Sequence, residues 1–114
     1  VVIKQVANKS RNKVTIIQSI DRKMPFDDIA RNVEMTHDEL LYELNNIVDA
    51  GTKLNINYYI KDKGDEEIID EIFDYFKGST TDAIDTAIRK LQEDDISEEE
   101  VLLARIKFIS DIAN

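Results

Sequence analysis

Cysteine, proline and glycine are scarce in this sequence: its 114 residues include no cysteine, one proline and three glycines. Without cysteine the chain can form no disulfide and no thiolate zinc site, either of which often stabilises a small domain from an oxidising compartment. We therefore expect a cytoplasmic protein. Because proline and glycine are the residues that most disfavour helix interiors, their scarcity favours helices.

Long hydrophobic runs are also missing. The apolar run at residues 1–3 is too short for a signal peptide, and no segment approaches the roughly 18–20 apolar residues that span a bilayer. With 42% hydrophobic and 34% charged residues, the composition is that of a soluble globular domain without a membrane partner. The chain begins with Val1 instead of methionine, which indicates a segment of a longer protein or a processed product.

Charge is distributed unevenly along the chain. The formal net charge is −9, and an even distribution of that charge would repel nucleic acid. Residues 1–36, however, carry a net charge of +3, whereas residues 37–114 carry −12. We therefore expect weak contact with DNA phosphates in the N-terminal segment, through Lys9, Arg11, Lys13, Arg22 and Lys23. The alternative is that these cations are solvated side chains of a linker between domains.

The first two predicted helices follow from the spacing of apolar residues. Between residues 10 and 22, valine and isoleucine recur at near-helical spacing behind a possible N-cap at Ser10. Pro25 suits the first position of a second, short helix, and Asp27 and Asp28 favour the positive end of its dipole. Two helices are therefore expected before residue 34.

The third helix has clear boundary signals. Thr36 and Glu39 have the spacing of a capping box, and Gly51 provides a C-terminal stop. Ala30 supplies a small residue where the second and third helices would cross, and apolar residues flank the turn between them. Together these features predict a helix-turn-helix motif over residues 25–51. An ordinary helical hairpin is the alternative.

Beyond Gly51 the pattern changes. Apolar and polar residues alternate over residues 54–60, which predicts a strand followed by a turn at 61–64, the elements of a wing. Helical spacing returns at residues 65–77, 81–91 and 97–113, and the last of these helices has a capping box and apolar residues on more than one face. Such a spread implies burial against several neighbours or against a missing part of a parent protein.

The predicted fold is therefore mainly α: a winged-helix-like helix-turn-helix followed by a small C-terminal helical bundle. We expect a linker from a parent protein at residues 1–9, the helix-turn-helix with its short strand at 10–61, and the bundle packed on it at 62–114. The three parts would form one compact domain.

The exposed face of the third helix is unsuited to DNA. The second helix of such a motif commonly enters the major groove. Here its outward positions hold three carboxylates and no Lys or Arg: His37, Asp38, Glu39, Tyr42, Glu43 and Asn46. Of the two tyrosines in the predicted strand, Tyr58 shares the apolar face and is expected in the core, whereas Tyr59 is the freer candidate for stacking on a base.

No catalytic, cofactor or metal site is predicted. Carboxylates between Asp65 and Asp74 stand four residues apart, a spacing that suits a divalent ion, but a solvated helix face accounts for them. The lone His37 has no second His or Cys with which to share a metal, and no nucleophile stands out as its partner. It is expected on the surface beside the Thr36 cap.

The sequence resembles, over residues 9–114, the helix-turn-helix domain at the C-terminus of many bacterial RecQ-type helicases, which follows the helicase core and the helicase-and-RNase-D C-terminal domain. The resemblance is carried by residues 24–30 (MPFDDIA), by the apolar positions of residues 40–47 with the following GTKLNINY, and by residues 98–109 (EEEVLLARIKFI). Two features depart from the family: Glu34 stands where many such turns carry glycine, and the third helix is acidic.

The resemblance implies a parent that uses ATP and Mg²⁺ to unwind DNA in repair or recombination. This sequence contains neither a G-x-x-x-x-G-K-S/T phosphate loop nor an Asp-Glu-x-His box, so we expect no ATPase activity and no cofactor in this chain. Our leading hypothesis is a monomeric, non-catalytic accessory domain that tunes how a helicase engages DNA or a protein partner. The alternative is a free-standing helix-turn-helix transcriptional regulator, which would need a cationic recognition face and commonly a dimer.

Overall fold

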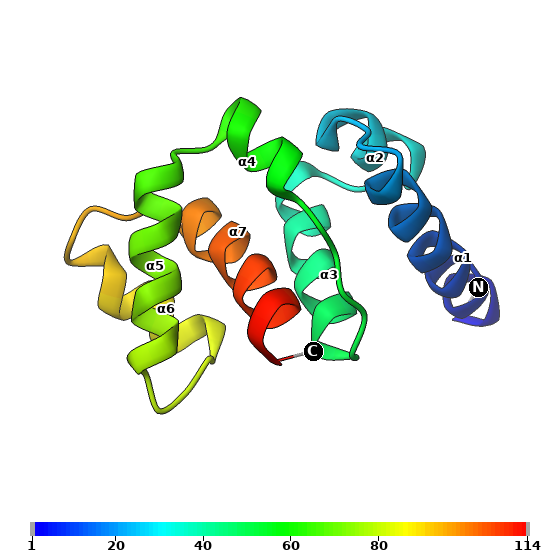
Figure 1. Cartoon of the computed structure of the whole chain (residues 1–114). Coiled ribbons are helices and arrows are strands. Elements are labelled where there is room, and N and C mark those ends of the chain that lie inside the picture. The colour runs from blue at the N-terminus through cyan, green and yellow to red at the C-terminus, as the bar shows by residue number, and fades with distance from the viewer. Residues whose placement is uncertain (1, 114) are drawn as a thin grey trace.

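A computed structural model describes the backbone of residues 2–113 and the side chains of residues 12–112. Within that range the chain is mainly helical and contains no strand (Figure 1). The elements are α1 (Val2–Asp21), α2 (Phe26–Asn32), α3 (His37–Asp49), α4 (Asn57–Lys63), α5 (Glu66–Gly78), α6 (Ile84–Gln92), α7 (Glu98–Phe108) and a final π-helical turn, η1 (Ile109–Ala113). The pairing of α2 with α3 and the bundle of α5, α6 and α7 confirm the predicted mainly α architecture.

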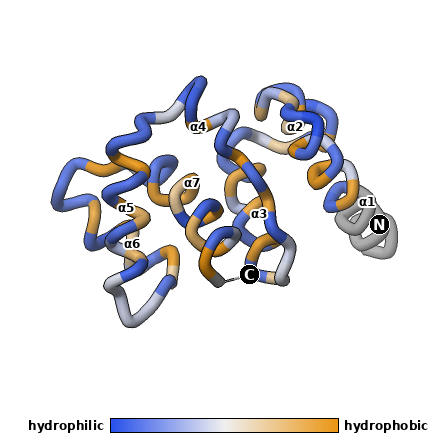
Figure 2. The backbone as a smooth tube through the Cα atoms, viewed as in Figure 1, coloured by the Kyte–Doolittle hydropathy of each residue, from blue (hydrophilic) through white to orange (hydrophobic). Residues whose placement is uncertain are grey.

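Helix α7 is the centre of the molecule. It lies between α3 and α5 and also packs against α6 (Figure 1). Residues 101–106 are all buried, so the apolar residues around this helix are covered by several neighbours within the chain. Buried hydrophobic residues of α3, α5 and α7 belong to one core cluster, and Figure 2 shows hydrophobic positions along all three helices. Of the two explanations for the spread of apolar residues on the last helix, burial against several neighbours is the correct one.

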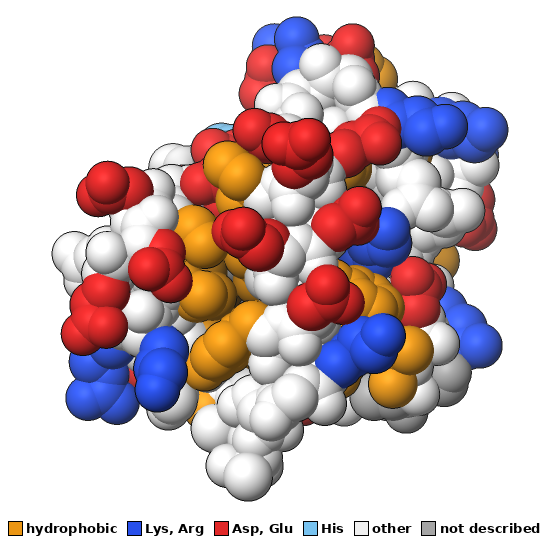
Figure 3. Space-filling view, turned by 60° about the vertical axis from the view of Figure 1, so that its left-hand side comes forward, with side chains coloured by type: hydrophobic (Ala, Val, Ile, Leu, Met, Phe, Trp, Pro, Cys, Tyr) orange, Lys and Arg blue, Asp and Glu red, His pale blue; other side chains and the backbone are white. Residues whose placement is uncertain are grey.

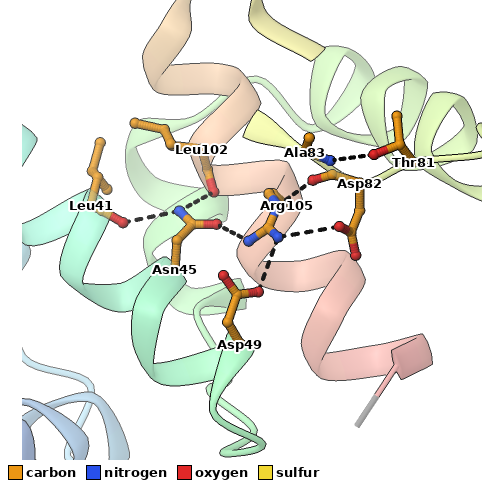
Figure 4. Close-up of polar contacts among 8 residues, drawn as sticks. All are labelled: Leu41, Asn45, Asp49, Thr81, Asp82, Ala83, Leu102 and Arg105. Carbon is orange, nitrogen blue, oxygen red and sulfur yellow. Dashed lines mark hydrogen bonds and ion pairs between the residues drawn. The ribbon is translucent and has the colours of Figure 1, made fainter. Parts of the chain in front are cut away.

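Arg105 is a buried cation where α3, α7 and the segment before α6 meet (Figure 4). Its Nε donates to the Asp82 carbonyl oxygen (2.7 Å) and its Nη1 donates to Asn45 Oδ1 (3.0 Å). Its Nη2 lies 3.0 Å from Asp49 Oδ1 and 3.5 Å from Asp82 Oδ1. Asn45 in turn donates to the Leu102 carbonyl (3.3 Å). This polar network holds the C-terminal bundle against the helix-turn-helix.

Both predicted capping boxes are formed. The Thr36 hydroxyl accepts from the Glu39 N–H (3.1 Å), and the Glu39 carboxylate accepts from the Thr36 N–H (2.8 Å). Ser97 and Glu100 make the same exchange at 3.2 and 3.0 Å. These bonds satisfy backbone donors that the first turn leaves free, and so they fix where α3 and α7 begin.

Four helices in the described range end at a residue in the left-handed backbone region. The residue is Gly51 after α3 (φ 105°), but it is Lys23 after α1 (59°), Glu34 after α2 (57°) and Asp95 after α6 (60°). At each end, the N–H groups of this residue and of the next donate to carbonyls in the last helical turn. Glu34 thus stands in a conformation that favours glycine.

The predicted strand at residues 54–60 is wrong, and so is the wing. Asn55 Oδ1 accepts from the N–H of Asn57 (3.1 Å), a local turn from which α4 begins. Leu54, Ile56 and Ile60 are buried, as the alternation predicted, but Ile56 and Ile60 also stand four residues apart and suit a helix face. A strand would need a partner for its backbone groups, and no other segment of the chain has a strand pattern.

The predicted start of the first helix is also wrong. Helix α1 begins at Val2, so Ser10 lies within the helix instead of capping it, and residues 2–9, expected as a linker, belong to α1. Helix α6 begins at Ile84, three residues later than predicted. None of the described helices is both long and apolar enough to cross a membrane.

Candidate nucleic-acid interface

The first turn of α7 contacts the face of α3 that a helix-turn-helix protein would turn toward DNA. His37 Nε2 lies 2.8 Å from Glu99 Oε1, and the Tyr42 hydroxyl donates to the Glu98 carboxylate. Two side chains of α3 with the capacity to donate to phosphate are thus engaged by carboxylates of the same chain. The remaining outward positions of α3 are acidic or neutral: Asp38, Glu39, Glu43 and Asn46.

Exposed cations gather instead where the end of α1 meets α4. Arg22 and Lys23 follow α1, and Lys61 and Lys63 lie in the last turn of α4. Lys23 lines two hollows at once: one of about 480 Å³, which Lys63 also lines, and one of about 380 Å³, which Lys61 lines. We call these four side chains the basic edge.

Local contacts hold the basic edge in place. Lys23 has its left-handed conformation because it ends α1, where its N–H donates to the Ile20 carbonyl (2.9 Å). The Tyr58 hydroxyl donates to the Met24 carbonyl, which ties α4 to the segment that follows α1. Because Ile60 buries the inner face of α4, the lysines of its last turn face solvent.

Three aromatic rings form the wall of the larger hollow. Tyr59 stacks on Phe26 with ring centroids 3.8 Å apart and an interplanar angle of 10°. Tyr58 meets the same Phe26 edge-on at 6.2 Å. Phe26 is 1% exposed, whereas both tyrosines are half-buried. Tyr59 is therefore less free than the sequence predicted, because Phe26 covers one face of its ring, and Tyr58 is only partly in the core.

Three tyrosines have a pKa raised to about 12. For Tyr42 the first cause is its hydrogen bond to Glu98, which favours the protonated phenol. For Tyr58 and Tyr59 the first cause is burial, and nearby carboxylates add to the effect at Tyr59. All three hydroxyls are therefore neutral donors at physiological pH.

Charge distinguishes the basic edge from the rest of the surface. Asp21, Asp27 and Asp62 line the same two hollows, and Lys63 Nζ lies 4.0 Å from Asp62 Oδ2. The lysines and aspartates of the linings therefore balance, and the region has a cationic excess of one charge only because Arg22 is exposed beside them. The other end of the molecule is more acidic, and carboxylates cover much of the side that α5 and α6 form (Figure 3). The exposed acids of α5 are Glu66, Glu67, Asp70, Glu71 and Asp74. Polyanions are therefore repelled less at the basic edge than at α3 or α5.

The structure brings together part of the predicted binding set. Lys23 and Tyr59 line the same hollow, and Arg22 is exposed beside Lys23. Lys13 is half-buried on α1, eight residues or about 12 Å before the helix ends, and it lines neither hollow. The side chains of Lys9 and Arg11 lie outside the described residues, so their role stays a prediction.

The two lysines of α4 were not predicted to belong to the interface. Lys61 and Lys63 were assigned to a turn after a strand, and they reach the hollows only because α4 folds back on the segment after α1. One signal for them was present: they follow the two adjacent tyrosines, Tyr58 and Tyr59, in the acidic part of the chain. Aromatic residues interleaved with cations are typical of single-strand binding.

One comparison with known families identifies the helix-turn-helix. Residues 10–60, from within α1 to within α4, match the family described as RecQ-1-like, helix-turn-helix domain. This segment is therefore similar to the helix-turn-helix domain of RecQ-type helicases. The match confirms the resemblance over these residues, and the matched segment includes Lys23, Tyr58 and Tyr59. The chain matches no curated protein.

Potential metal ligands are dispersed in the part of the chain whose side chains are described. No group of three or more His, Asp or Glu side chains there is arranged to hold a metal ion. His37, the one histidine, is half-buried and paired with Glu99, so it lies beside the Thr36 cap as predicted but is not simply solvated.

Proposed function

We propose that this chain is a non-catalytic accessory domain of an ATP-dependent DNA helicase, and that it binds DNA phosphates through the basic edge instead of α3. One observation carries the proposal: His37 and Tyr42 of α3 are engaged by carboxylates of α7, whereas Lys23, Lys61 and Lys63 are exposed around two hollows. Among the side chains that the structure describes, only Lys63 of these three lysines has an ion-pair partner, Asp62 at 4.0 Å, and that pair is itself exposed. The domain thereby tunes how the helicase engages DNA in repair and recombination.

In this proposal the chemistry of unwinding belongs to other parts of the parent protein. The sequence has no phosphate loop for ATP, and a motor domain of the parent would hold ATP and Mg²⁺. The contribution of this domain is to position a strand. Because the whole chain carries a net charge of −9, its own affinity for DNA is weak, and because that affinity comes from phosphate contacts, it falls as salt is added.

The basic edge is tested by a charge-matched pair of variants. The first replaces Lys23, Lys61 and Lys63 with glutamine, and the control replaces Lys77, Arg89 and Lys90, which are exposed on α5 and α6. Both remove three positive charges, so any general effect of net charge is equal. Affinities for labelled DNA, measured by fluorescence anisotropy at two salt concentrations, give the salt slope. We expect the first variant to bind more weakly, with a slope shallower by up to about 0.9 for each duplex phosphate that it no longer neutralises.

A third variant with the same charge change distinguishes the basic edge from the N-terminal segment. It replaces Lys9, Arg11 and Lys13 with glutamine. We expect this variant to lose less affinity for DNA than the variant in which Lys23, Lys61 and Lys63 are replaced. Equal losses for all three variants would indicate a general charge effect, and a loss confined to the third variant would contradict the proposed interface.

A further inference from the structure

The larger hollow combines three kinds of chemistry in one place. Its wall is aromatic, with half-buried Tyr58 and Tyr59 packed on Phe26. Cations stand in its lining at Lys23 and Lys63. Its volume of about 480 Å³ falls within the roughly 300–1,000 Å³ of small-ligand sites. The hollow therefore has room for one flat ring with charged groups beside it.

Aromatic walls between cations suit an unpaired nucleobase better than a duplex. Base pairs of a duplex are stacked on one another and present only their edges, so a stacking wall would find no ring face there. A single strand offers the face of each base and a phosphate on either side of it. The ring stack of Tyr59 on Phe26 also limits how far the tyrosine side chain can move, which lowers the cost of ordering it on binding.

The two hollows together indicate the course of the strand. Lys23 and Tyr58 line both of them, and Lys61 lines the smaller one, so lysines stand on two sides of the aromatic wall. Asp27 and Asp62 in the larger hollow would repel phosphates at their own positions, but their oxygens accept hydrogen bonds from the exocyclic amino groups of bases. Phosphates would therefore lie along Lys23 and the α4 lysines, with the base directed inward.

We propose that the hollow between α2 and α4 binds one unpaired nucleobase of a single DNA strand, with Tyr59 as the stacking residue and the flanking phosphates at Lys23, Lys61 and Lys63. This inference rests on the proposed function and deepens it, because it names the form of DNA that the basic edge holds.

The test compares two strands that differ only in their bases. One is a ten-nucleotide oligo-dC, and the other is a strand of equal length in which every residue is an abasic analogue with the same phosphates. One base–aromatic stack corresponds to an affinity change of about 5- to 150-fold. We expect the unmodified chain to bind oligo-dC more tightly than the abasic strand by a factor in this range.

A variant pair assigns the difference to Tyr59. Tyr59→Leu should bind the two strands almost equally and should bind a ten-base-pair duplex as the unmodified chain does. The control is Tyr75→Leu, because Tyr75 is also half-buried and also packs on a phenylalanine, Phe76 at 5.4 Å, but on α5 away from the hollow. It should keep the full preference for oligo-dC. Thermal unfolding of both variants verifies that they are folded.

The outcomes separate this inference from the proposed function. Equal affinity of the unmodified chain for oligo-dC and for the abasic strand, with binding still lost when Lys23, Lys61 and Lys63 are replaced, would overturn the stacked base and leave the basic edge in place. The same holds if Tyr75→Leu removes the preference as much as Tyr59→Leu does. No binding of any strand or duplex would overturn both, and it would direct attention to a protein partner at the hollow.

Discussion

Replacing Arg105 with methionine should destabilise the whole chain, because this side chain joins α3, α7 and the segment before α6. Arg105 is 6% exposed along its side chain, and Asn45, which accepts from it at 3.0 Å, is fully buried. Loss of the guanidinium leaves Asn45 Oδ1 without a donor, which costs about 1–3 kcal/mol. The Asp82 carbonyl loses a charge-assisted bond of 2.7 Å, worth about 1–2 kcal/mol net at a partly buried site.

The two ion pairs add less to this total. The Asp49 and Asp82 side chains are 44% and 50% exposed, so each carboxylate regains water when the arginine is lost, and each pair is worth at most about 1 kcal/mol. Methionine restores part of the packing. We expect unfolding free energy to fall by about 2–4 kcal/mol, or about 8–16 °C in Tm for a domain of this size.

Chemical denaturation followed by circular dichroism measures the change. The matched control is Arg89→Met, which removes an exposed arginine from α6 and should change stability by less than about 0.5 kcal/mol. Arg105→Lys should fall between the two, because an ammonium cannot reproduce the planar fork of donors. If Arg105→Met were as stable as the Arg89→Met control, the polar network would contribute nothing and the bundle would be held by apolar packing alone.

Three further results are expected. Glu34→Gly should stabilise the fold by about 0.5–1 kcal/mol, because glycine relieves the strain of the left-handed backbone at this position (φ 57°). Gly51→Ala should destabilise the fold by about 1 kcal/mol, because alanine would be strained at φ 105°. Chemical denaturation measures both changes, and a lower midpoint for Glu34→Gly than for Gly51→Ala would refute the assignment of strain. Since the folded pKa values of Tyr42, Tyr58 and Tyr59 are about 12, above the unfolded value of about 10, their stabilising effect is complete below pH 10 and is lost as the pH rises toward 12. Absorbance titration of the tyrosines with midpoints near 10 would contradict this. The chain should sediment as a monomer at micromolar concentration and should release no phosphate from ATP; a tight dimer would favour the transcriptional regulator instead.

Local signals made most helices predictable from sequence. The capping boxes at Thr36 and Ser97 set the starts of α3 and α7 through bonds that span three residues, and Gly51 marked the end of α3. The prediction of a strand at residues 54–60 failed for a physical reason. The apolar alternation of these residues is compatible with a short helix as well as a strand, and tertiary packing decides between them. Ile60 reaches the core from α4, and Ile56 reaches it from the N-cap position just before this helix.

The candidate site was less predictable because it depends on contacts between distant segments. Charge along the chain indicated Lys23, and the exposed acidic face of α3 was evident from residue spacing alone. The hydrogen bond from Tyr58 to the Met24 carbonyl joins residues 34 apart, and together with the packing of Tyr58 and Tyr59 on Phe26 it holds α4 beside the end of α1. Likewise, nothing local to α3 indicates that Glu99 of α7 engages His37.

The most direct test of the DNA interface is residue-resolved. Backbone amide signals of the isotope-labelled chain, followed by NMR during titration with oligo-dC at low salt, report which residues sense the strand. The proposed interface predicts that the signals of Lys23, Tyr59 and Lys61 shift together and saturate with one affinity, while those of Glu39 and Glu43 stay in place. Shifts concentrated at Glu39 and Glu43, with the basic edge unchanged, would contradict it and would identify α3 as the DNA-binding helix.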